Sequence, residues 1–245
     1  MNKKIWNNIF NISLQYIIPT RCILCNEFLM SAVESDWKSP QLCYECWNKI
    51  EFISHTSCQK CGGNIDFDGA ECRHCCDYPF AFCQAKACIV YNQNSQKLFF
   101  QLKHHANDSV VSMMGKWMIS RLKLFDYRHD VIVAMPLSRW RLFSRGFNQS
   151  SLLLCEIQKE YSHSLVDLSH KFLRIKNTPS QGHKNAQERH INVKGAFQAC
   201  EHSFKSKSVL LIDDVFTSGA SLDACAEELL FKGASRVDVL VVGRA

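Results

Sequence analysis

The sequence predicts an α/β fold in which a mainly parallel sheet is flanked by helices and preceded by a small zinc-ribbon module. Three features support this prediction. Eight cysteines form four Cys-x-x-Cys pairs before residue 76. After residue 80, strand-like and helix-like runs alternate along the chain. Near residue 210, an apolar strand leads through two acids and several small residues into a helix.

The paired cysteines predict two structural zinc ions. A two-residue spacing lets both sulfurs of one knuckle bind the same ion, and two knuckles complete a closed tetrahedral site. Sequential pairing joins the first knuckle with the second and the third with the fourth. A cross-braced pairing of the first with the third is also open, and Cys76 could replace Cys75. The expected ligands are Cys22, Cys25, Cys43, Cys46, Cys58, Cys61, Cys72 and Cys75.

Metal binding is favoured over disulfides because the sequence shows no secretory signal. The basic start, Met1–Lys4, is followed by a polar-interrupted stretch without a cleavage site. No run reaches the ~18 to 20 apolar residues that would span a bilayer. We therefore expect a cytoplasmic protein. Residues 5–18 have loosely helical apolar spacing, which predicts a helix that packs on the zinc module, with a membrane anchor as the weaker alternative.

The net charge of +6 is unevenly distributed. Residues 1–80 carry seven Lys and Arg against nine Asp and Glu, whereas residues 81–245 carry 22 against 14. Within the basic part, residues 139–194 hold ten basic and only four acidic residues. This stretch predicts a surface for phosphate groups, either of a nucleotide or of a nucleic-acid backbone. An ordinary solvated basic face is the alternative.

The second part of the chain is expected to form βαβ units. Predicted strands cover residues 87–91, 131–135, 209–212 and 237–242, and predicted helices cover 96–103, 110–122, 147–160 and 222–231. Ligands of such sheets bind at the carboxyl ends of the strands. The module boundary is predicted near Pro79. Residues 1–80 would then form the N-terminal helix and double zinc ribbon, and residues 81–245 the α/β domain.

The run from Val209 to Ser221 predicts a ribose-phosphate site. Four apolar residues bury a strand, and the acids that follow can accept hydrogen bonds from vicinal hydroxyls. The small residues next in sequence let backbone amides converge at the start of a helix, where phosphates bind. Gly219 would permit a close approach of the backbone. The candidate ligand-binding residues are Asp213, Asp214, Thr217, Ser218, Gly219, Ala220 and Ser221.

This run resembles the phosphoribosyl-pyrophosphate motif of type I phosphoribosyltransferases, with Ser218 where a second Thr is usual. Further blocks are similar to the ComF family of competence proteins, over essentially the whole chain. They are 136–138, Arg141, 145–150, Thr178 with Gln181, Arg189 with Asn192, 196–197 and 102–105, together with the tandem Cys-x-x-Cys pairs. Many family members have His where this chain has Ser138.

The resemblance implies a type I phosphoribosyltransferase-like fold with a pyrophosphate loop at residues 135–139. That loop would add Pro136, Leu137, Ser138, Arg139 and Arg145 to the ligand-binding residues. It also implies a competence factor that handles internalised single-stranded DNA during natural transformation, with other competence proteins as possible partners. Mg²⁺ with phosphoribosyl pyrophosphate is a possible cofactor pair. The expected nucleic-acid contacts are Arg139, Arg141, Arg145, Lys184 and Arg189.

Two other functions stay open at this point. The chain could be an active Mg-dependent phosphoribosyltransferase that acts on an unidentified base or amine, although the sequence shows no hood that selects a base. It could also be a regulator that the zinc module directs to duplex DNA, which the acidic balance of that module disfavours. The sequence assigns no catalytic residue, so the question of enzymatic activity is left open.

Overall fold

The structure is a computed structural model that describes residues 21–29, 41–54, 56–65, 71–177 and 193–245. The chain divides into two compact units, Met1–Ile50 and Glu51–Ala245. The predicted helix over residues 5–18 lies outside the described residues. Within the described part, none of the helices has both the length and the apolar character that crossing a bilayer requires.

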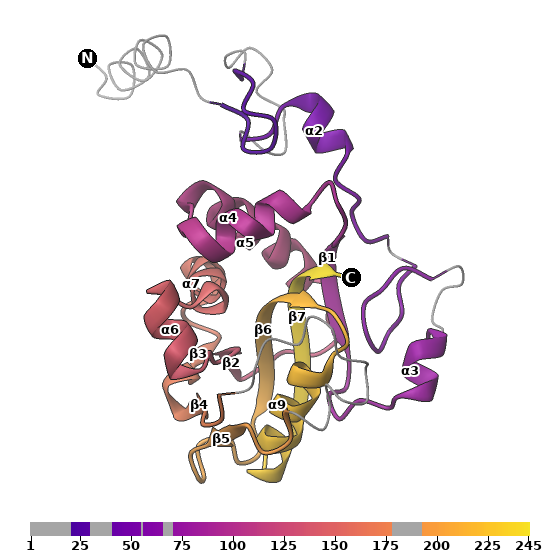
Figure 1. The fold of residues 1–245 in the computed structure, drawn as a ribbon. Coiled ribbons are helices and arrows are strands. Elements are labelled where there is room, and N and C mark those ends of the chain that lie inside the picture. The colour runs from indigo at the N-terminus through magenta and orange to yellow at the C-terminus, as the bar shows by residue number, and fades with distance from the viewer. Residues whose placement is uncertain (1–20, 30–40, 55, 66–70, 178–192) are drawn as a thin grey trace, which may run out of the picture. The chain divides into compact units, whose positions relative to one another are not determined.

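The second unit is built on a five-stranded sheet in the order β1-β7-β6-β2-β3 (Figure 1). Every neighbouring pair runs parallel, so all carboxyl ends lie at one edge. The predicted α/β fold with a mainly parallel sheet is thereby confirmed. The strands are β1 (Ala85–Val90), β2 (Val131–Ala134), β3 (Val166–Asp167), β6 (Ser208–Phe216) and β7 (Arg236–Arg244).

Helices cover both faces of this sheet (Figure 1). One face packs against α5 (Asp108–Leu122) and α7 (Gln149–Tyr161), with α4 (Gln96–His105) beside them. The other face packs against α9 (Ala220–Phe231) and a two-stranded antiparallel sheet of β4 (Phe172–Arg174) and β5 (Phe197–Ala199). A 3-10 turn, η1 (Ser169–Lys171), precedes β4. Alternating residues of the strands fill the two cores, as the period of two requires.

The second half of the cysteine-rich region is part of this unit. Cys58, Cys61 and Cys75 are buried in the same hydrophobic cluster as Phe80, Phe82 and the α9 face of the sheet. A short helix, α3 (Arg73–Asp77), closes this segment, while α2 (Tyr44–Asn48) belongs to the first unit. The boundary between the two compact units therefore falls after the second Cys-x-x-Cys pair and before the third. The module boundary at residue 80 is placed from the change in sequence composition, and it stays a prediction.

Two features of the fold differ from the sequence-based expectation. The strand predicted to end at Ile212 continues to Phe216, so Asp213 and Asp214 lie within β6. It continues because apolar β7 extends alongside it, with Asp213 in register with Val241. The segment after Ser138 forms a further helix, α6 (Arg139–Arg145), which has no buried residue and therefore no apolar periodicity to reveal it.

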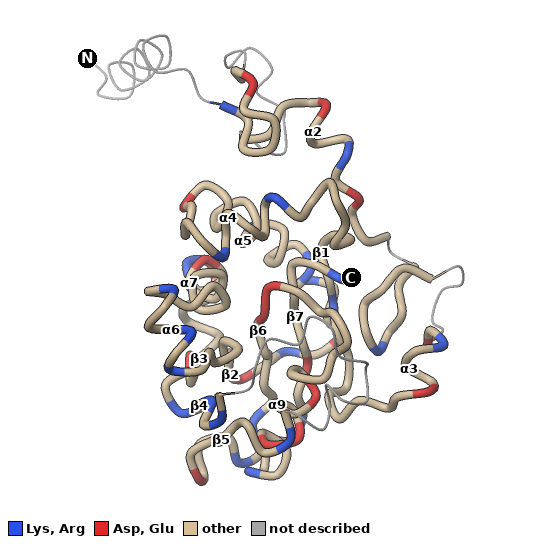
Figure 2. The backbone as a smooth tube through the Cα atoms, viewed as in Figure 1, with Lys and Arg blue, Asp and Glu red and all other residues tan. Residues whose placement is uncertain are grey.

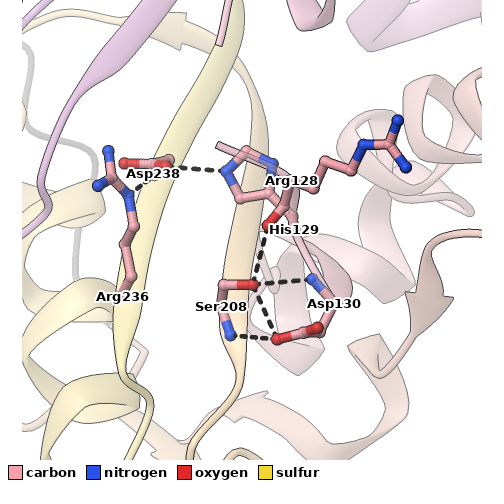
Figure 3. Close-up of polar contacts among 6 residues, drawn as sticks. All are labelled: Arg128, His129, Asp130, Ser208, Arg236 and Asp238. Atoms are coloured by element: carbon pink, nitrogen blue, oxygen red, sulfur yellow. Dashed lines mark hydrogen bonds and ion pairs between the residues drawn. The ribbon is translucent and has the colours of Figure 1, made fainter. Parts of the chain in front are cut away.

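A polar cluster at the opposite edge of the sheet ties the starts of three strands together (Figure 3). Asp238 on β7 is fully buried, and its Oδ2 lies 2.8 Å from both His129 Nε2 and Arg236 Nε. Asp130 accepts hydrogen bonds from the backbone N–H and the hydroxyl of Ser208, each at 2.8 Å. Burial opposes ionisation of Asp238, but the bonds from His129 and Arg236 outweigh it and lower its pKa.

We expect Asp238→Asn to destabilise the protein by about 3 kcal/mol at pH 7, because it removes one partner of a buried charge pair. A pKa lowered by folding means that this stability is complete above the unfolded-state pKa of about 4 and is lost as the pH falls through the folded value. The difference between the two proteins should therefore shrink in acid. Urea unfolding from pH 3 to 8 measures it. Asp130→Asn, at an exposed carboxylate of the same cluster, is the control and should cost less.

Candidate functional site

A pocket of about 350 Å³ opens at the carboxyl edge of the sheet. It brings together side chains from six separate parts of the second unit, and three of these side chains are cationic. Asp214 and Val215 come from β6, and Thr217 and Ser221 from the loop and helix that follow. The complete lining is Tyr91, Lys103, Arg141, Arg174, Asp214, Val215, Thr217 and Ser221.

The two acids of β6 have different surroundings. Asp214 is buried, and its Oδ2 lies 2.9 Å from Lys103 Nζ of α4, which forms an ion pair at the pocket wall. Asp213 is half-buried and accepts hydrogen bonds from Ser150 Oγ and from the backbone N–H of Asp214, both at 2.9 Å. Burial and the neighbouring Asp214 charge raise the pKa of Asp213 to about 8. Part of the carboxylate surface is thus already engaged before any ligand binds.

The block at residues 145–149, Arg-Gly-Phe-Asn-Gln, has a structural explanation. Gly146 ends α6 in the left-handed conformation, with φ +81°. Asn148 caps α7 by accepting from Ser150 N–H, and its own amide donates to Met135 O at the end of β2. Ser150, in the first turn of α7, donates its hydroxyl hydrogen bond to Asp213. Arg145 donates to Gln149. The block therefore fastens the loop after β2 to the acidic pair on β6.

The residues of the predicted pyrophosphate loop are divided between the interior and the surface. Pro136 and Ser138 are buried, Leu137 is half-buried, and Ser138 Oγ caps α6 by accepting from Arg141 N–H. Arg141 reaches the pocket, whereas Arg139 is exposed on the helix. Lys184 and Arg189 lie outside the described residues, as does the block from Thr178 to Asn192.

The loop after β6 positions the start of α9 at the pocket. Thr217 and Ser221 line the pocket, while Ser218 is half-buried and Ala220 is buried. Gly219 has φ +81°, and a Cβ at this position would lie 2.6 Å from Phe80 Cε1. Its missing side chain therefore faces the aromatic core. This glycine thus allows the loop to pack closely against Phe80, and its place among the ligand-binding residues stays a prediction.

Two sets of four cysteines form candidate metal centres. In each set, the four sulfur atoms lie within 4.8 Å of one another. One set is Cys22, Cys25, Cys43 and Cys46, and the other is Cys58, Cys61, Cys72 and Cys75. Cys76 is exposed and outside both sets. The sulfurs therefore group in sequential pairs, as the first of the two predicted arrangements requires.

Sulfur separations within the sets fit tetrahedral zinc. Four thiolates at the usual Zn–S distance of ~2.3 Å stand ~3.8 Å apart. Cys25 and Cys43 are 3.6 Å apart, Cys58 and Cys75 are 3.8 Å apart, and Cys61 and Cys72 are 3.6 Å apart. All four positions would be filled by protein, so bound zinc would stabilise the fold and offer no site for a reacting water. The two clusters support structural zinc.

The second cysteine cluster is joined to the pocket loop by Arg244. One guanidinium nitrogen lies 3.9 Å from Cys61 Sγ. The other donates to the carbonyl oxygens of Phe216 and Thr217, at 3.2 and 3.0 Å. The guanidinium also lies over the Phe216 ring, 4.5 Å from its centroid. A displacement of the Cys61 knuckle would therefore be transmitted to the loop that lines the pocket.

Besides Val215, which lies within the predicted run from Val209 to Ser221, the sequence analysis missed three pocket residues, Tyr91, Lys103 and Arg174. Lys103 stands in one of the blocks that resemble the ComF family, which was a usable signal. Tyr91 follows β1, and Arg174 ends a three-residue strand that carries no periodic pattern. Their placement depends on the crossing of distant segments, which spacing along the chain does not encode.

We expect the purified protein to hold two zinc ions per chain, and Cys61→Ser and Cys25→Ser each to lose one, because each removes a ligand from a different cluster. Only Cys61→Ser should also speed hydrogen exchange at residues 216–221, through the Arg244 contacts. Elemental analysis and exchange mass spectrometry measure these results. Equal exchange in the two variants would contradict the link between cluster and loop.

Comparisons with known proteins agree with this architecture. Residues 13–76 match the family model of the double zinc ribbon domain. The chain is 26% identical to competence protein ComFC of Bacillus subtilis over 226 residues, covering 86% of this chain and 89% of that protein. It is 28% identical to the DNA utilization protein YhgH of Escherichia coli over 232 residues, covering 91% and 96%.

Among solved structures, a hypoxanthine phosphoribosyltransferase from Staphylococcus aureus aligns with a TM-score of 0.34 at 16% identity, over 54% of this chain and 61% of that one. The sequence relatives extend along nearly their whole lengths, and the zinc-ribbon match falls on the paired cysteines. The predicted resemblance is confirmed as a similarity: over most of its length the chain is similar to proteins named for competence and for DNA utilization, and the match to the double zinc ribbon precedes most of its parallel α/β domain.

Proposed function

We propose that the chain is a competence factor that handles internalised single-stranded DNA during natural transformation and holds a ribose phosphate in its pocket. Relatives named for competence and for DNA utilization support the cellular role. The observation that carries the molecular part is the pocket itself, where Asp214 of the acidic pair meets three cations and the start of a helix.

The pocket offers separate groups for the two ends of a ribose phosphate. Asp214, beside Asp213, provides carboxylate oxygens that can accept hydrogen bonds from vicinal hydroxyls. Thr217 and Ser221 provide hydroxyls next to the amino end of α9, where backbone N–H groups and the helix dipole favour a phosphate. A volume of about 350 Å³ falls at the lower end of ordinary ligand pockets and suits a ligand of this size.

The cations of the pocket extend this preference to further phosphates. Arg141 and Arg174 can each bind phosphate oxygens in two-pronged fashion, and Lys103 adds a third positive charge. Phosphoribosyl pyrophosphate with Mg²⁺ is the small ligand that we propose, because its phosphates match this charge. The same arginines, with exposed Arg139 on α6, would bind the backbone of single-stranded DNA.

An active Mg-dependent phosphoribosyltransferase, acting on an unidentified base or amine, is the second candidate. It is favoured by Asp213, whose pKa of about 8 allows a proton to move near neutral pH. The two functions differ in one measurable outcome. Pyrophosphate release with any acceptor supports the enzyme, whereas ligand binding without release supports a binding module.

We expect Asp213→Asn with Asp214→Asn to weaken binding of phosphoribosyl pyrophosphate and Mg²⁺ about a hundredfold. Charge-assisted hydrogen bonds contribute roughly 1.5 to 3 kcal/mol each, and about 1.4 kcal/mol is one decade of affinity. Calorimetry measures the affinity. Asp130→Asn makes the same chemical change at the opposite edge of the sheet and should leave binding unaltered. Equal affinity in the double variant would place the ligand elsewhere.

We expect single-stranded DNA to bind with a steep salt dependence, and Arg139→Gln, Arg141→Gln and Arg145→Gln together to weaken it. Loss of three phosphate contacts should lower the slope of log K against log salt by about 2, since each contributes ~0.7 on single strands. Fluorescence anisotropy across a salt series measures this.

The matched control changes Lys123, Lys205 and Lys207 to Gln, which removes the same charge from exposed positions away from α6. An equal loss in this control would mean that net charge, and not α6, carries the binding. Preference for a duplex of the same length would instead favour a duplex-directed regulator.

A further inference from the structure

Helix α6 presents large apolar side chains to solvent. Its seven residues include no buried one. Phe143 is 85% exposed, the highest value for a large hydrophobic side chain in the described part of the chain, and Trp140 is 66% exposed. Leu142 is exposed as well, at 45%. Grouped exposure of this kind marks an interaction surface, whereas single exposed apolar residues need no explanation.

The two rings lie together on one side of α6. Trp140 and Phe143 are three positions apart, which places them on neighbouring turns of the same helix face. Their ring centroids are 6.5 Å apart, and the ring planes are tilted by 31°. Both rings are largely exposed, so neither of them packs α6 onto the sheet. The pair forms a ready-made aromatic surface.

Three arginines share the short helix with these rings. The helix alternates arginines with apolar residues: Arg139 and Arg145 at its ends, and Arg141 between the two rings in sequence. Arg141 lines the pocket together with Arg174 of β4, so the basic side of α6 continues into the pocket. Figure 2 shows blue segments on α6 and at β4 along the same side of the second unit. A polyanion with flat apolar groups is the partner that matches this surface.

We propose that Trp140 and Phe143 form a stacking platform for the bases of single-stranded nucleic acid, while the adjacent arginines hold its phosphates. This inference rests on the proposed DNA-handling function and assigns it a base-contacting site. Unpaired bases expose faces that stack on aromatic rings regardless of sequence, whereas the bases of a duplex are already stacked. A protein partner would also use Trp and Arg, but the excess of ten basic over four acidic residues in 139–194 favours a polyanion.

The test compares a 20-nucleotide oligo(dT) with an abasic deoxyribose-phosphate chain of the same length. We expect Trp140→Ala with Phe143→Ala to weaken binding of oligo(dT) about tenfold or more, because base–aromatic stacking contributes substantially for each base. Binding of the abasic chain should not change. The salt slope on oligo(dT) should also be preserved, since no phosphate contact is removed. Thermal unfolding confirms that the exposed substitutions leave the fold intact.

Two control variants sharpen the comparison. Phe231→Ala removes an equally exposed ring, 80% exposed at the end of α9, and should have no effect on oligo(dT). Trp140→Phe with Phe143→Tyr keeps both aromatic faces and should retain most of the affinity.

The outcomes separate this inference from the function on which it rests. Unchanged oligo(dT) binding in the alanine variant, with binding still weakened by the α6 arginine variant, overturns the platform and leaves the DNA role standing. Equal losses on oligo(dT) and the abasic chain overturn stacking as the mechanism. If the unaltered protein binds neither chain, both the platform and the proposed function fail. Unchanged DNA binding with a loss of transformation in cells points to a protein partner on α6 and also overturns the platform.

Discussion

The pocket depends on the packing between the second cysteine cluster and the loop after β6. Arg244 spans Cys61 Sγ and two carbonyl oxygens of that loop, and Phe80 fills the space beneath Gly219. Ala81 N–H donates to Asp223 Oδ1 in the first turn of α9 at 2.6 Å, so the helix start is fixed from the same side. The segment that carries the second cysteine cluster therefore holds both the loop after β6 and the start of α9.

The acidic pair on β6 is held at a cost in stability. Its Asp213 has a raised pKa because burial and Asp214 both oppose its ionisation. An acid whose pKa is raised by folding stabilises the protein fully below its unfolded value of about 4, and that contribution is lost as the pH rises through about 8. Near neutral pH, a ligand that donates hydrogen bonds or brings positive charge would therefore stabilise the ionised form of Asp213. Lys103 already provides such compensation for Asp214, 2.9 Å away.

The sequence predicted the features that depend on local pattern. It did not predict those that depend on contacts between segments far apart in the chain. The parallel sheet and its principal helices follow from apolar periodicity, and the zinc ligands follow from two-residue spacing. The length of β6 could not be read, because acids inside a strand are disfavoured by propensity and tolerated here only through pairing with β7. Pocket residues Tyr91 and Arg174 could not be found either. Only the folded arrangement of β1, β4 and β6 brings them to Asp214.

Helix α6 shows why local pattern is a weak guide to a helix that has no buried face. Core packing selects apolar residues at regular intervals, and that regularity is what identifies a helix in sequence. A helix with no buried face is free of this selection, so α6 combines Arg with aromatic residues without a buried stripe. Its position is fixed at both ends, by the Ser138 cap and by the Gly146–Asn148 turn that leads to Asp213 through Ser150. The contacts that anchor α6 are therefore the same ones that build the acidic side of the pocket. One hydrogen-bonded segment, from Ser138 to Ser150, therefore connects the exposed basic and aromatic helix with the acidic pair beside the pocket.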